Sequence, residues 1–336
     1  MQKRWQRLCE VVEGLEQILI VLHDDPDPDA VASGAALAHL LQEVVGIEGT
    51  LVYRGVIGRA ENRALVEYLG AALETVPDDA VVRGSRQQAI AVIDTQPGAG
   101  NCPVPAGSPT TIVIDHHSGQ ENDSGGFRDV RPWIGALSTI LTQYLRAAEV
   151  KPPMKLATAL FYGIKTDTKA LSRDTSAADV AAYFYLLSFA DIDALVEIEN
   201  AQVPAAYFKN MNQAMQAARI YDGTVISYIG PTDYPDLTAE MADLFLRLEG
   251  VDWVVCLGVF EEILYLSVRA REDDADAEAL AQEIIDGEGS AGGRNTLAGG
   301  QIPLDGRAVE RVVEQIRRRA LQYLQVSLDT VGAPLV

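Results

Sequence analysis

The chain has 336 residues, of which 48% are hydrophobic, and a formal net charge of -21 at pH 7. This length and apolar content predict a globular protein of two domains with a sizeable core, and they exclude a disordered chain. So acidic a protein disfavours duplex DNA as a partner, because duplex binding depends on basic residues that displace counterions from the phosphates.

The N-terminal residues lack the continuous apolar run and the small-residue cleavage site of a signal peptide. No stretch approaches the length and apolar character of a membrane span. Cys9, Cys102 and Cys256 are odd in number and too widely spaced for a disulfide framework or a CxxC metal site. We therefore expect a cytoplasmic protein that does not bind a membrane.

The first half alternates short β-rich runs with helical patterns, which is typical of an α/β fold with a mostly parallel sheet flanked by helices. Residues 18–22 are a predicted strand that leads into the polar segment 23–29. Residues 30–45 then form a predicted helix that ends at Gly46. Further strands are predicted at residues 89–93, followed by Asp94, and at 111–114, followed by Asp115-His116-His117.

Helical patterns dominate the next part of the chain. Residues 137–148 and 154–162 are predicted helices, and the second leads into the polar segment 163–168. Another helix is predicted at residues 177–189.

A new strand pattern after residue 220 predicts a second, smaller α/β domain. We place the catalytic domain at residues 1–200, a helical linker at 201–220 and the second domain at 221–336, with a cleft between the domains. The elements expected in the second domain are strands at 224–229, 253–260 and 263–270, a glycine-rich loop at 287–300 and a closing helix at 307–326.

Acids and histidines gather after the predicted parallel strands, where open α/β sheets bind their ligands. Three of the four histidines lie in these segments. Each segment alone has an ordinary explanation: Asp29 caps a helix, Asp94 caps a turn, Asp115-His116-His117 is a solvated loop, and Asp167 bonds backbone amides. Their coincidence at one edge of the sheet favours a metal site instead.

A mixed set of oxygen and imidazole ligands suits Mn²⁺, with Mg²⁺, Co²⁺ or Fe²⁺ as alternatives, and the absence of thiolates argues against structural zinc. Two cations about 3.5–4 Å apart and bridged by a carboxylate activate a water and stabilise both oxygens of an in-line displacement. This is the chemistry of phosphate ester hydrolysis. No GxSxG or Walker loop indicates another route.

The polar segments together resemble the four motifs of the DHH (RecJ-like) phosphoesterase superfamily, especially its nanoRNase and 3'-phosphoadenosine-5'-phosphate phosphatase branch. The resemblance spans nearly the whole chain. It implies that one metal is held by His23, Asp27 and Asp94, and the other by Asp29, Asp94, His116 and Asp167. It also implies a catalytic set in which Asp94 bridges the metals, His117 faces the scissile phosphate and Asp115 orients neighbouring groups.

The second half is similar to the DHH-associated C-terminal domain, which in the family grips the substrate. The residues that this similarity assigns to substrate binding, besides His117, are Arg269, Gly292, Gly293, Arg294, Gly299 and Gly300. Arg294 departs from the family pattern, which has histidine after the paired glycines. The alternatives from the residues alone are a flexible linker for the glycines and a solvated strand charge for Arg269.

The resemblance implies a two-metal hydrolase of short oligonucleotides (nanoRNA, linear dinucleotides), nucleoside 3',5'-bisphosphates, or both. The alternatives are a pyrophosphatase or exopolyphosphatase, and a nucleotide-binding module without activity, which the complete ligand set disfavours. The cofactors expected are two divalent cations, with Mn²⁺ preferred. The expected partner is a short oligonucleotide or nucleotide rather than duplex DNA, and a homodimer is compatible with the sequence.

Overall fold

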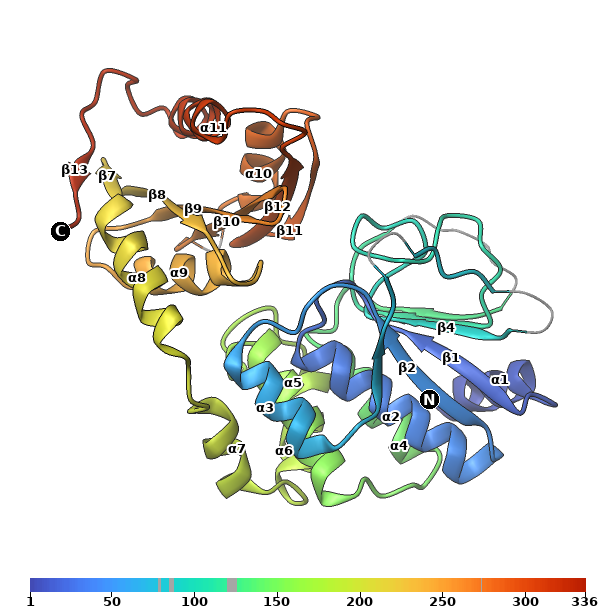
Figure 1. Cartoon of the computed structure of the whole chain (residues 1–336). Coiled ribbons are helices and arrows are strands. Elements are labelled where there is room, and N and C mark those ends of the chain that lie inside the picture. Colours follow the sequence, from blue (N-terminus) through green and yellow to red (C-terminus); the bar gives the residue numbers. More distant parts are fainter. Residues whose placement is uncertain (78–79, 85–87, 120–125, 273) are drawn as a thin grey trace. The chain divides into compact units, whose positions relative to one another are not determined.

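A computed structural model describes residues 1–77, 80–84, 88–119, 126–272 and 274–336. The chain divides into two compact units, Met1–Ala201 and Gln202–Val336, and each is described by itself (Figure 1). None of the helices in these described ranges combines the length and the apolar character that crossing a bilayer requires.

The first unit is built on a six-stranded sheet in which every pair of neighbours is parallel. The strand order is β3-β2-β1-β4-β5-β6. The strands are β1 (Gln17–Val21), β2 (Glu48–Tyr53), β3 (Leu73–Thr75), β4 (Ile90–Ile93), β5 (Ile112–Asp115) and β6 (Phe127–Val130). This confirms the predicted α/β class and the mostly parallel sheet.

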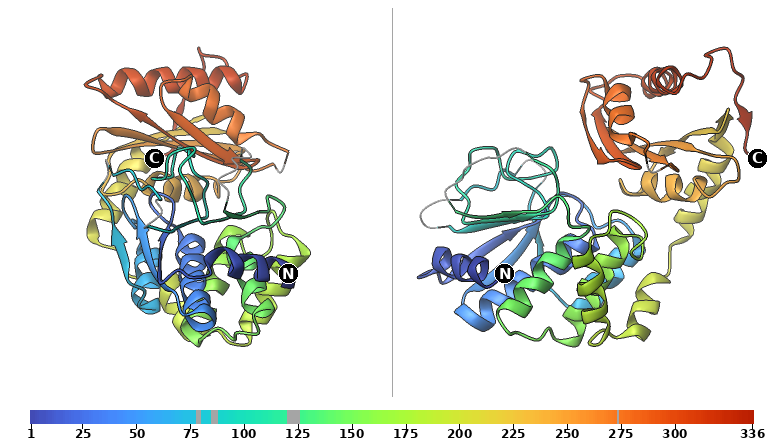
Figure 2. Two further views of the ribbon diagram at one scale, coloured as in Figure 1. Left: turned by 90° about the vertical axis from the view of Figure 1, so that its right-hand side faces the viewer. Right: turned by 180° about the vertical axis from the view of Figure 1, so that it is seen from behind.

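Helices cover one face of this sheet, and irregular chain covers the other (Figures 1 and 2). The helices of the unit are α1 (Gln2–Val12), α2 (Pro28–Val45), α3 (Ala60–Leu69), α4 (Leu137–Ala147), α5 (Met154–Asp167), α6 (Ala177–Leu187) and α7 (Ile192–Glu199). Alternate strand residues serve the two faces, as the pleat requires: Ile112 and Ile114 join the helix-side core, whereas Val113 packs with Cys102 and Val104. The sheet is therefore buried on both sides.

Helix α2 shows how the sequence fixes local structure next to the strand ends. Asp27 is its N-cap, and its side chain accepts a hydrogen bond from the backbone N–H of Ala30 at 3.0 Å. Pro28 occupies the first turn, where a missing N–H costs nothing. Gly46 ends the helix with φ of 78°, a conformation that glycine adopts without strain.

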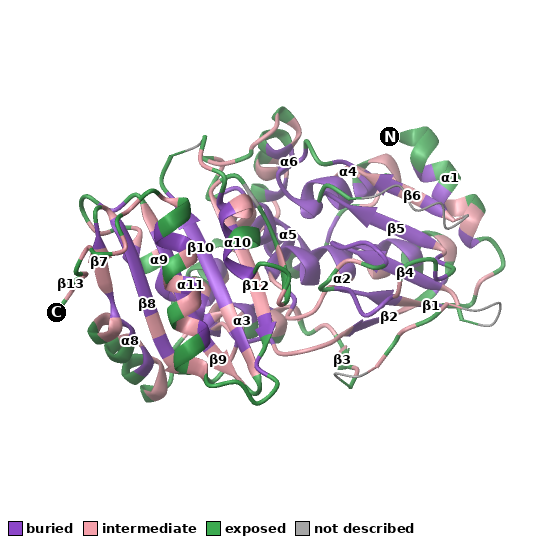
Figure 3. Ribbon diagram, turned by 90° about the horizontal axis from the view of Figure 1, so that it is seen from above, coloured by how far each residue is buried: buried purple, intermediate pink, exposed green. Residues whose placement is uncertain are grey.

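The second unit contains a seven-stranded mixed sheet in the order β11-β12-β10-β9-β8-β7-β13. Its strands are β7 (Arg219–Tyr221), β8 (Thr224–Pro231), β9 (Trp253–Phe260), β10 (Ile263–Ala270), β11 (Ser290–Arg294), β12 (Leu297–Pro303) and β13 (Ala333–Pro334). Its helices are α8 (Ala205–Ala217), α9 (Leu237–Phe245), α10 (Ala277–Ile285) and α11 (Val309–Tyr323). The central strands of both sheets are largely buried (Figure 3).

Two segments of the second unit bear on predictions made from the sequence. The prediction of a glycine-rich loop at residues 287–300 is wrong, because β11 and β12 form an antiparallel hairpin there. In this hairpin Ser290 pairs with Gln301 at one end and Arg294 with Leu297 at the other. The segment predicted as a helical linker holds α8, whose Ala214 packs into a core with Val225 and Met241 of the second unit.

Candidate metal centre

The polar segments meet at the carboxyl edge of the parallel sheet, where strand order changes direction. β1 lies between β2 and β4, so the chain leaves β1 toward one side and returns through β4 on the other. Such a switch point leaves a crevice beyond the strand ends. His23 follows β1, and Asp94 follows β4 directly.

His23 presents one ring nitrogen to two carboxylates. Its Nδ1 lies 2.7 Å from the carbonyl oxygen of Asp24, which only accepts, so Nδ1 carries the proton. Its Nε2 then faces Asp27 Oδ1 at 3.9 Å and Asp94 Oδ2 at 3.7 Å.

Asp94 lies at the centre of the arrangement. Its backbone adopts φ of 62°, an uncommon conformation that Asp tolerates better than most residues. The side chain is 2% exposed, and within the described ranges its Oδ1 is buried without a hydrogen-bond partner. Because leaving a buried carboxylate oxygen in this state is costly, the site is suited to an added cation.

His116 repeats the pattern of His23 on the other side of Asp94. Its Nδ1 lies 3.1 Å from the carbonyl oxygen of Ile134 and donates to it. Its Nε2 lies 3.3 Å from Asp94 Oδ1, 3.5 Å from Asp167 Oδ2 and 3.9 Å from Asp29 Oδ2. A carbonyl that holds the far nitrogen is the usual support of a metal-ligating histidine.

Asp29 is fully buried and also caps another helix. Its two oxygens accept the backbone N–H groups of Leu137 at 2.5 Å and Ser138 at 2.8 Å. These amides lie in the first turn of α4, whose own N-cap residue, Ala136, has no side-chain oxygen that could accept their hydrogen bonds. A Cβ atom at Gly163 of α5 would lie 2.5 Å from Ser138 Oγ and 2.9 Å from Asp29 Oδ1, so only glycine allows this approach.

Asp115 holds His117 beside this arrangement, with the ring Nδ1 3.7 Å from Asp94 Oδ1. Oδ1 of the buried Asp115 accepts the Nδ1–H of His117 at 2.8 Å. Burial raises the pKa of Asp115, but the hydrogen bond and charge of His117 together with the hydrogen bond from Gln96 and the charge of His116 outweigh burial and lower the pKa to about 2. Nε2 is thus the ring atom of His117 left for another molecule, and this side chain is 47% exposed.

The six residues that we call the acid–histidine cluster are His23, Asp27, Asp29, Asp94, His116 and Asp167. Two groups of three within it, His23/Asp27/Asp94 and Asp29/His116/Asp167, each have potential ligand atoms within 4.8 Å of one another. The structure therefore brings together all six residues that the sequence nominated as metal ligands. Asp94 Oδ1 faces the second group, so this carboxylate lies between the two.

The protonation of the cluster also fits a cation site. Burial and the charge of Asp94 raise the pKa of Asp29 to about 7, and burial with the charge of Asp27 raises that of Asp94 to about 6. Burial alone lowers the pKa of His23, but Asp27 and Asp94 outweigh it and raise it to about 10. Without metal, protons thus neutralise crowded carboxylates, and oxygen and imidazole donors of this kind bind divalent cations.

The predicted substrate residues of the second unit lie on adjacent strands of its sheet. Gly292 pairs with Gly299 in β12, which pairs with Ser267 in β10. Arg269 is 8% exposed, and its guanidinium donates to Asp243 Oδ1 at 2.7 Å and Ser267 Oγ at 2.8 Å. Arg269 is thus already held by its own unit.

One residue beside the cluster was missed by the sequence reasoning. Nε2 of Gln96 donates to Asp115 Oδ2 at 2.7 Å, and its Oε1 accepts a hydrogen bond from Arg128. Its position two residues after Asp94 was the available signal.

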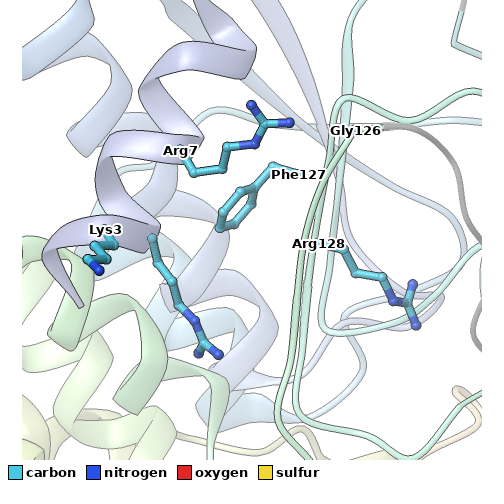
Figure 4. A pocket seen from close by; sticks show the side chains of 6 residues that line it. Lys3, Arg7, Gly126, Phe127 and Arg128 are labelled. Carbon is cyan, nitrogen blue, oxygen red and sulfur yellow. The ribbon is translucent and has the colours of Figure 1, made fainter.

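A pocket of about 400 Å³ elsewhere in this unit contains none of the cluster residues (Figure 4). It is lined by Lys3, Arg4, Arg7, Gly126, Phe127 and Arg128.

The fold and this cluster define an α/β protein with a candidate divalent-metal centre at the switch point of its sheet. The family model described as "DHH family, N-terminal domain" matches residues 17–164. An uncharacterized protein of Methanocaldococcus jannaschii is 34% identical over 336 residues, which cover 96% of this chain and 68% of that protein. The chain therefore belongs to the DHH family and is a hydrolase of the phosphoesterase type.

Two further relatives differ in how much of the chain they match. A probable manganese-dependent inorganic pyrophosphatase of Streptococcus agalactiae is 27% identical over 184 residues, which span 53% of this chain and 57% of that protein. The crystal structure of an exopolyphosphatase-related protein from Bacteroides fragilis has a TM-score of 0.70 at 17% identity, covering 96% of this chain and 97% of that one. The similarity to this crystal structure shows the fold of the chain along nearly its whole length.

Proposed function

We propose that this protein is a two-metal phosphoesterase that hydrolyses short oligonucleotides, nucleoside 3',5'-bisphosphates, or both. The observation that carries the proposal is Asp94, a buried carboxylate between two groups of donors. His23, Asp27 and Asp94 would hold one cation, and Asp29, Asp94, His116 and Asp167 the other. Mn²⁺ is the preferred metal because the donors are mixed oxygen and imidazole, and Mg²⁺ or Co²⁺ are the alternatives.

The roles of the surrounding residues follow from their contacts. Two bound cations would lower the pKa of an attacking water and neutralise charge on the phosphoryl oxygens. His117 would meet the substrate through Nε2, because Asp115 occupies Nδ1. The net charge of -21 supports a short anion rather than duplex DNA as the substrate, since bound cations dominate the local field.

In the second unit, we propose that Arg294 and the glycines Gly292, Gly293, Gly299 and Gly300 contact the substrate phosphate. Arg294 stands at the end of β11, where the family pattern has histidine. A charge-assisted hydrogen bond contributes about 1.5–3 kcal/mol, so Arg294→Ala should lower kcat/KM about ten- to a hundred-fold without loss of metal. Unchanged kcat/KM in Arg294→Ala would make Arg269, which Asp243 and Ser267 hold in place, the better candidate for the phosphate contact.

The second candidate function is hydrolysis of pyrophosphate or polyphosphate. It is favoured by the similarity of about half the chain to proteins named manganese-dependent inorganic pyrophosphatases. A single screen separates the candidates: the purified protein with Mn²⁺ is given linear dinucleotides, a nucleoside 3',5'-bisphosphate, cyclic dinucleotides, pyrophosphate and polyphosphate. Products are identified by chromatography and phosphate release. Turnover of pyrophosphate or polyphosphate alone would replace the first proposal with the second.

A further inference from the structure

The side-chain amide of Gln96 is fixed at both ends. This residue is 7% exposed, and its Oε1 accepts a hydrogen bond from Nη2 of Arg128. Its Nε2 donates to Asp115 Oδ2 at 2.7 Å and to the carbonyl oxygen of His117 at 3.2 Å. A guanidinium can only donate and a carboxylate can only accept, so the amide has one possible orientation.

Asp115 transmits this orientation to His117. Besides the bond from Gln96, it accepts the backbone N–H groups of His116 at 2.8 Å and His117 at 3.1 Å, and the ring Nδ1 of His117 at 2.8 Å. A carboxylate with four donors around it has little freedom to rotate. The imidazole therefore keeps its proton on Nδ1 and presents Nε2 outward.

The side chain of Arg128 donates to Gln96 in the loop after β4 rather than to α1. It lies on β6, in register with Val113. Although Arg128 lines the pocket beside α1, its side chain extends away from Phe127 and Arg7 (Figure 4). The bond to Gln96 thus links β6 to the loop that follows β4.

The backbone after the histidines encloses the same amide. A Cβ atom built on Gly119 would lie 2.3 Å from Nε2 and 2.4 Å from Oε1 of Gln96. A methyl group there must push the amide aside, and it costs the fold little because only the end of a flexible side chain has to move. Gly119→Ala is therefore a second way to displace Gln96.

We infer that Gln96, held by Arg128, is a positioning residue that acts through Asp115 to fix the ring of His117 with Nε2 toward the substrate. This inference rests on the proposed function, because it assigns His117 to the scissile phosphate. A purely structural bond would tie β6 to the loop without affecting that ring. The two readings differ in the tautomer of His117 and in how the effects of substitutions combine.

The direct test is ¹⁵N NMR of protein labelled at its four histidines, recorded metal-free and with diamagnetic Mg²⁺. The wild-type His117 ring should be the Nδ1–H tautomer. Gln96→Met and Gly119→Ala should both give a mixture of tautomers. Gln143→Met is the matched control, because Gln143 also accepts from an arginine, Arg131, at 2.7 Å, yet it has no contact with Asp115 among the described residues. It should leave the His117 signal unchanged.

Kinetics provide the second readout. Loss of a supporting residue behind a site costs about 10- to 100-fold in activity, so Gln96→Met should lower kcat by that factor while metal content and Tm stay near wild type. In a His117→Ala background, the same change should cost less than about twofold, because residues that act as a unit are not additive. Arg128→Lys, which can still donate to Oε1, should retain more activity than Arg128→Met.

The outcomes separate this inference from the proposed function. An unchanged His117 signal and kcat in Gln96→Met, with an active wild type, would overturn the inference and leave the function standing. Full additivity with His117→Ala would also overturn it. A wild type that cleaves no phosphoester would refute the function, while the NMR comparison would still decide whether Gln96 positions the ring. If Gln96→Met does not fold, Gly119→Ala gives the same readouts.

Discussion

Two buried acidic sites of the first unit differ in what neutralises them. Asp129 on β6 accepts hydrogen bonds from Arg4 at 2.9 Å, from Nε of Arg131 at 2.8 Å and from the hydroxyl of Tyr144 at 2.5 Å. In contrast, the recorded ion-pair partners of Asp29 and Asp94 within the described ranges are histidines alone.

This difference distinguishes a structural carboxylate from a metal ligand. A buried charge is tolerated when the chain itself supplies a cation and hydrogen bonds, as it does for Asp129. At Asp94 the chain instead adds further carboxylates nearby, and no described residue donates a hydrogen bond to Oδ1. The fold therefore keeps one acidic site complete and the other open to a cation from solution.

The largest expected effect is at Asp94. Asp94→Asn keeps the shape but removes the charge between the two donor groups, so activity should fall to background and bound metal should decrease. Because the folded-state pKa of Asp94 is raised to about 6, its ionisation above that pH destabilises the metal-free fold. The metal-free variant should thus have a Tm equal to or above that of wild type at pH 8. Calorimetry and metal analysis check both statements; a folded variant with full activity would contradict the assignment.

Asp129→Asn should instead lower stability and leave metal binding unchanged. Removing one partner of a buried ion pair costs about 3–5 kcal/mol, because Arg131 is itself buried. The free energy of unfolding should fall by that amount, while the metal content per folded protein stays that of wild type. Denaturant titration and metal analysis on the same samples are the measurements. Loss of metal in the folded variant would show that the two sites are not independent.

Metal affinity should depend on pH at the cluster. The raised pKa values of Asp29, Asp94 and His23 mean that protons must leave as metal binds, so affinity should rise with pH. Each released proton changes the affinity about tenfold per pH unit, which gives about a hundred-fold or more between pH 6 and 8. Titration calorimetry with Mn²⁺ in buffers of different ionisation enthalpy counts the protons. A pH-independent affinity would refute this protonation pattern.

The smallest change is at Tyr144. Tyr144→Phe removes the hydroxyl that donates to Asp129 and keeps the ring, so the free energy of unfolding should fall by about 1.5–3 kcal/mol. This loss should be smaller than that of Asp129→Asn, since the arginines remain. Activity should not change. A loss equal to that of Asp129→Asn would mean that the hydroxyl, rather than Arg131, is the main partner of the carboxylate.

The strand-end positions of the cluster were accessible from sequence because they depend on a local rule. Buried strands are short apolar runs, so Asp94 and Asp115 could be placed where such runs stop. The end of α5 was less accessible: the predicted helix stopped before Gly163, whereas the helix continues to Asp167. Glycine weakens a helix locally, and the contact with Asp29 that favours it here comes from a distant segment.

The hairpin of the second unit could not be predicted for a similar reason. Glycine is depleted in strands, yet a Cβ atom at Gly293 would lie 2.3 Å from the carbonyl oxygen of Leu297, and one at Gly300 would lie 2.3 Å from Ile285 Cδ1. Packing by α10 and by the facing strand requires these glycines. Likewise, nothing local connects Gln96 with Arg128, because the two residues are 32 positions apart.

The double use of Asp29 has a consequence for how such a protein can change over evolution. One carboxylate both faces the metal site and caps the first turn of α4. A substitution there therefore alters the ligand set and the N-terminal capping of α4 in one step. A variant that exchanges its metal by mutating Asp29 must also find a new acceptor for the amides of Leu137 and Ser138. Asp27, in contrast, caps the N-terminus of α2, the helix that it directly precedes. Adaptation to other metals is therefore easier from the Asp27 side of the centre than from the Asp29 side.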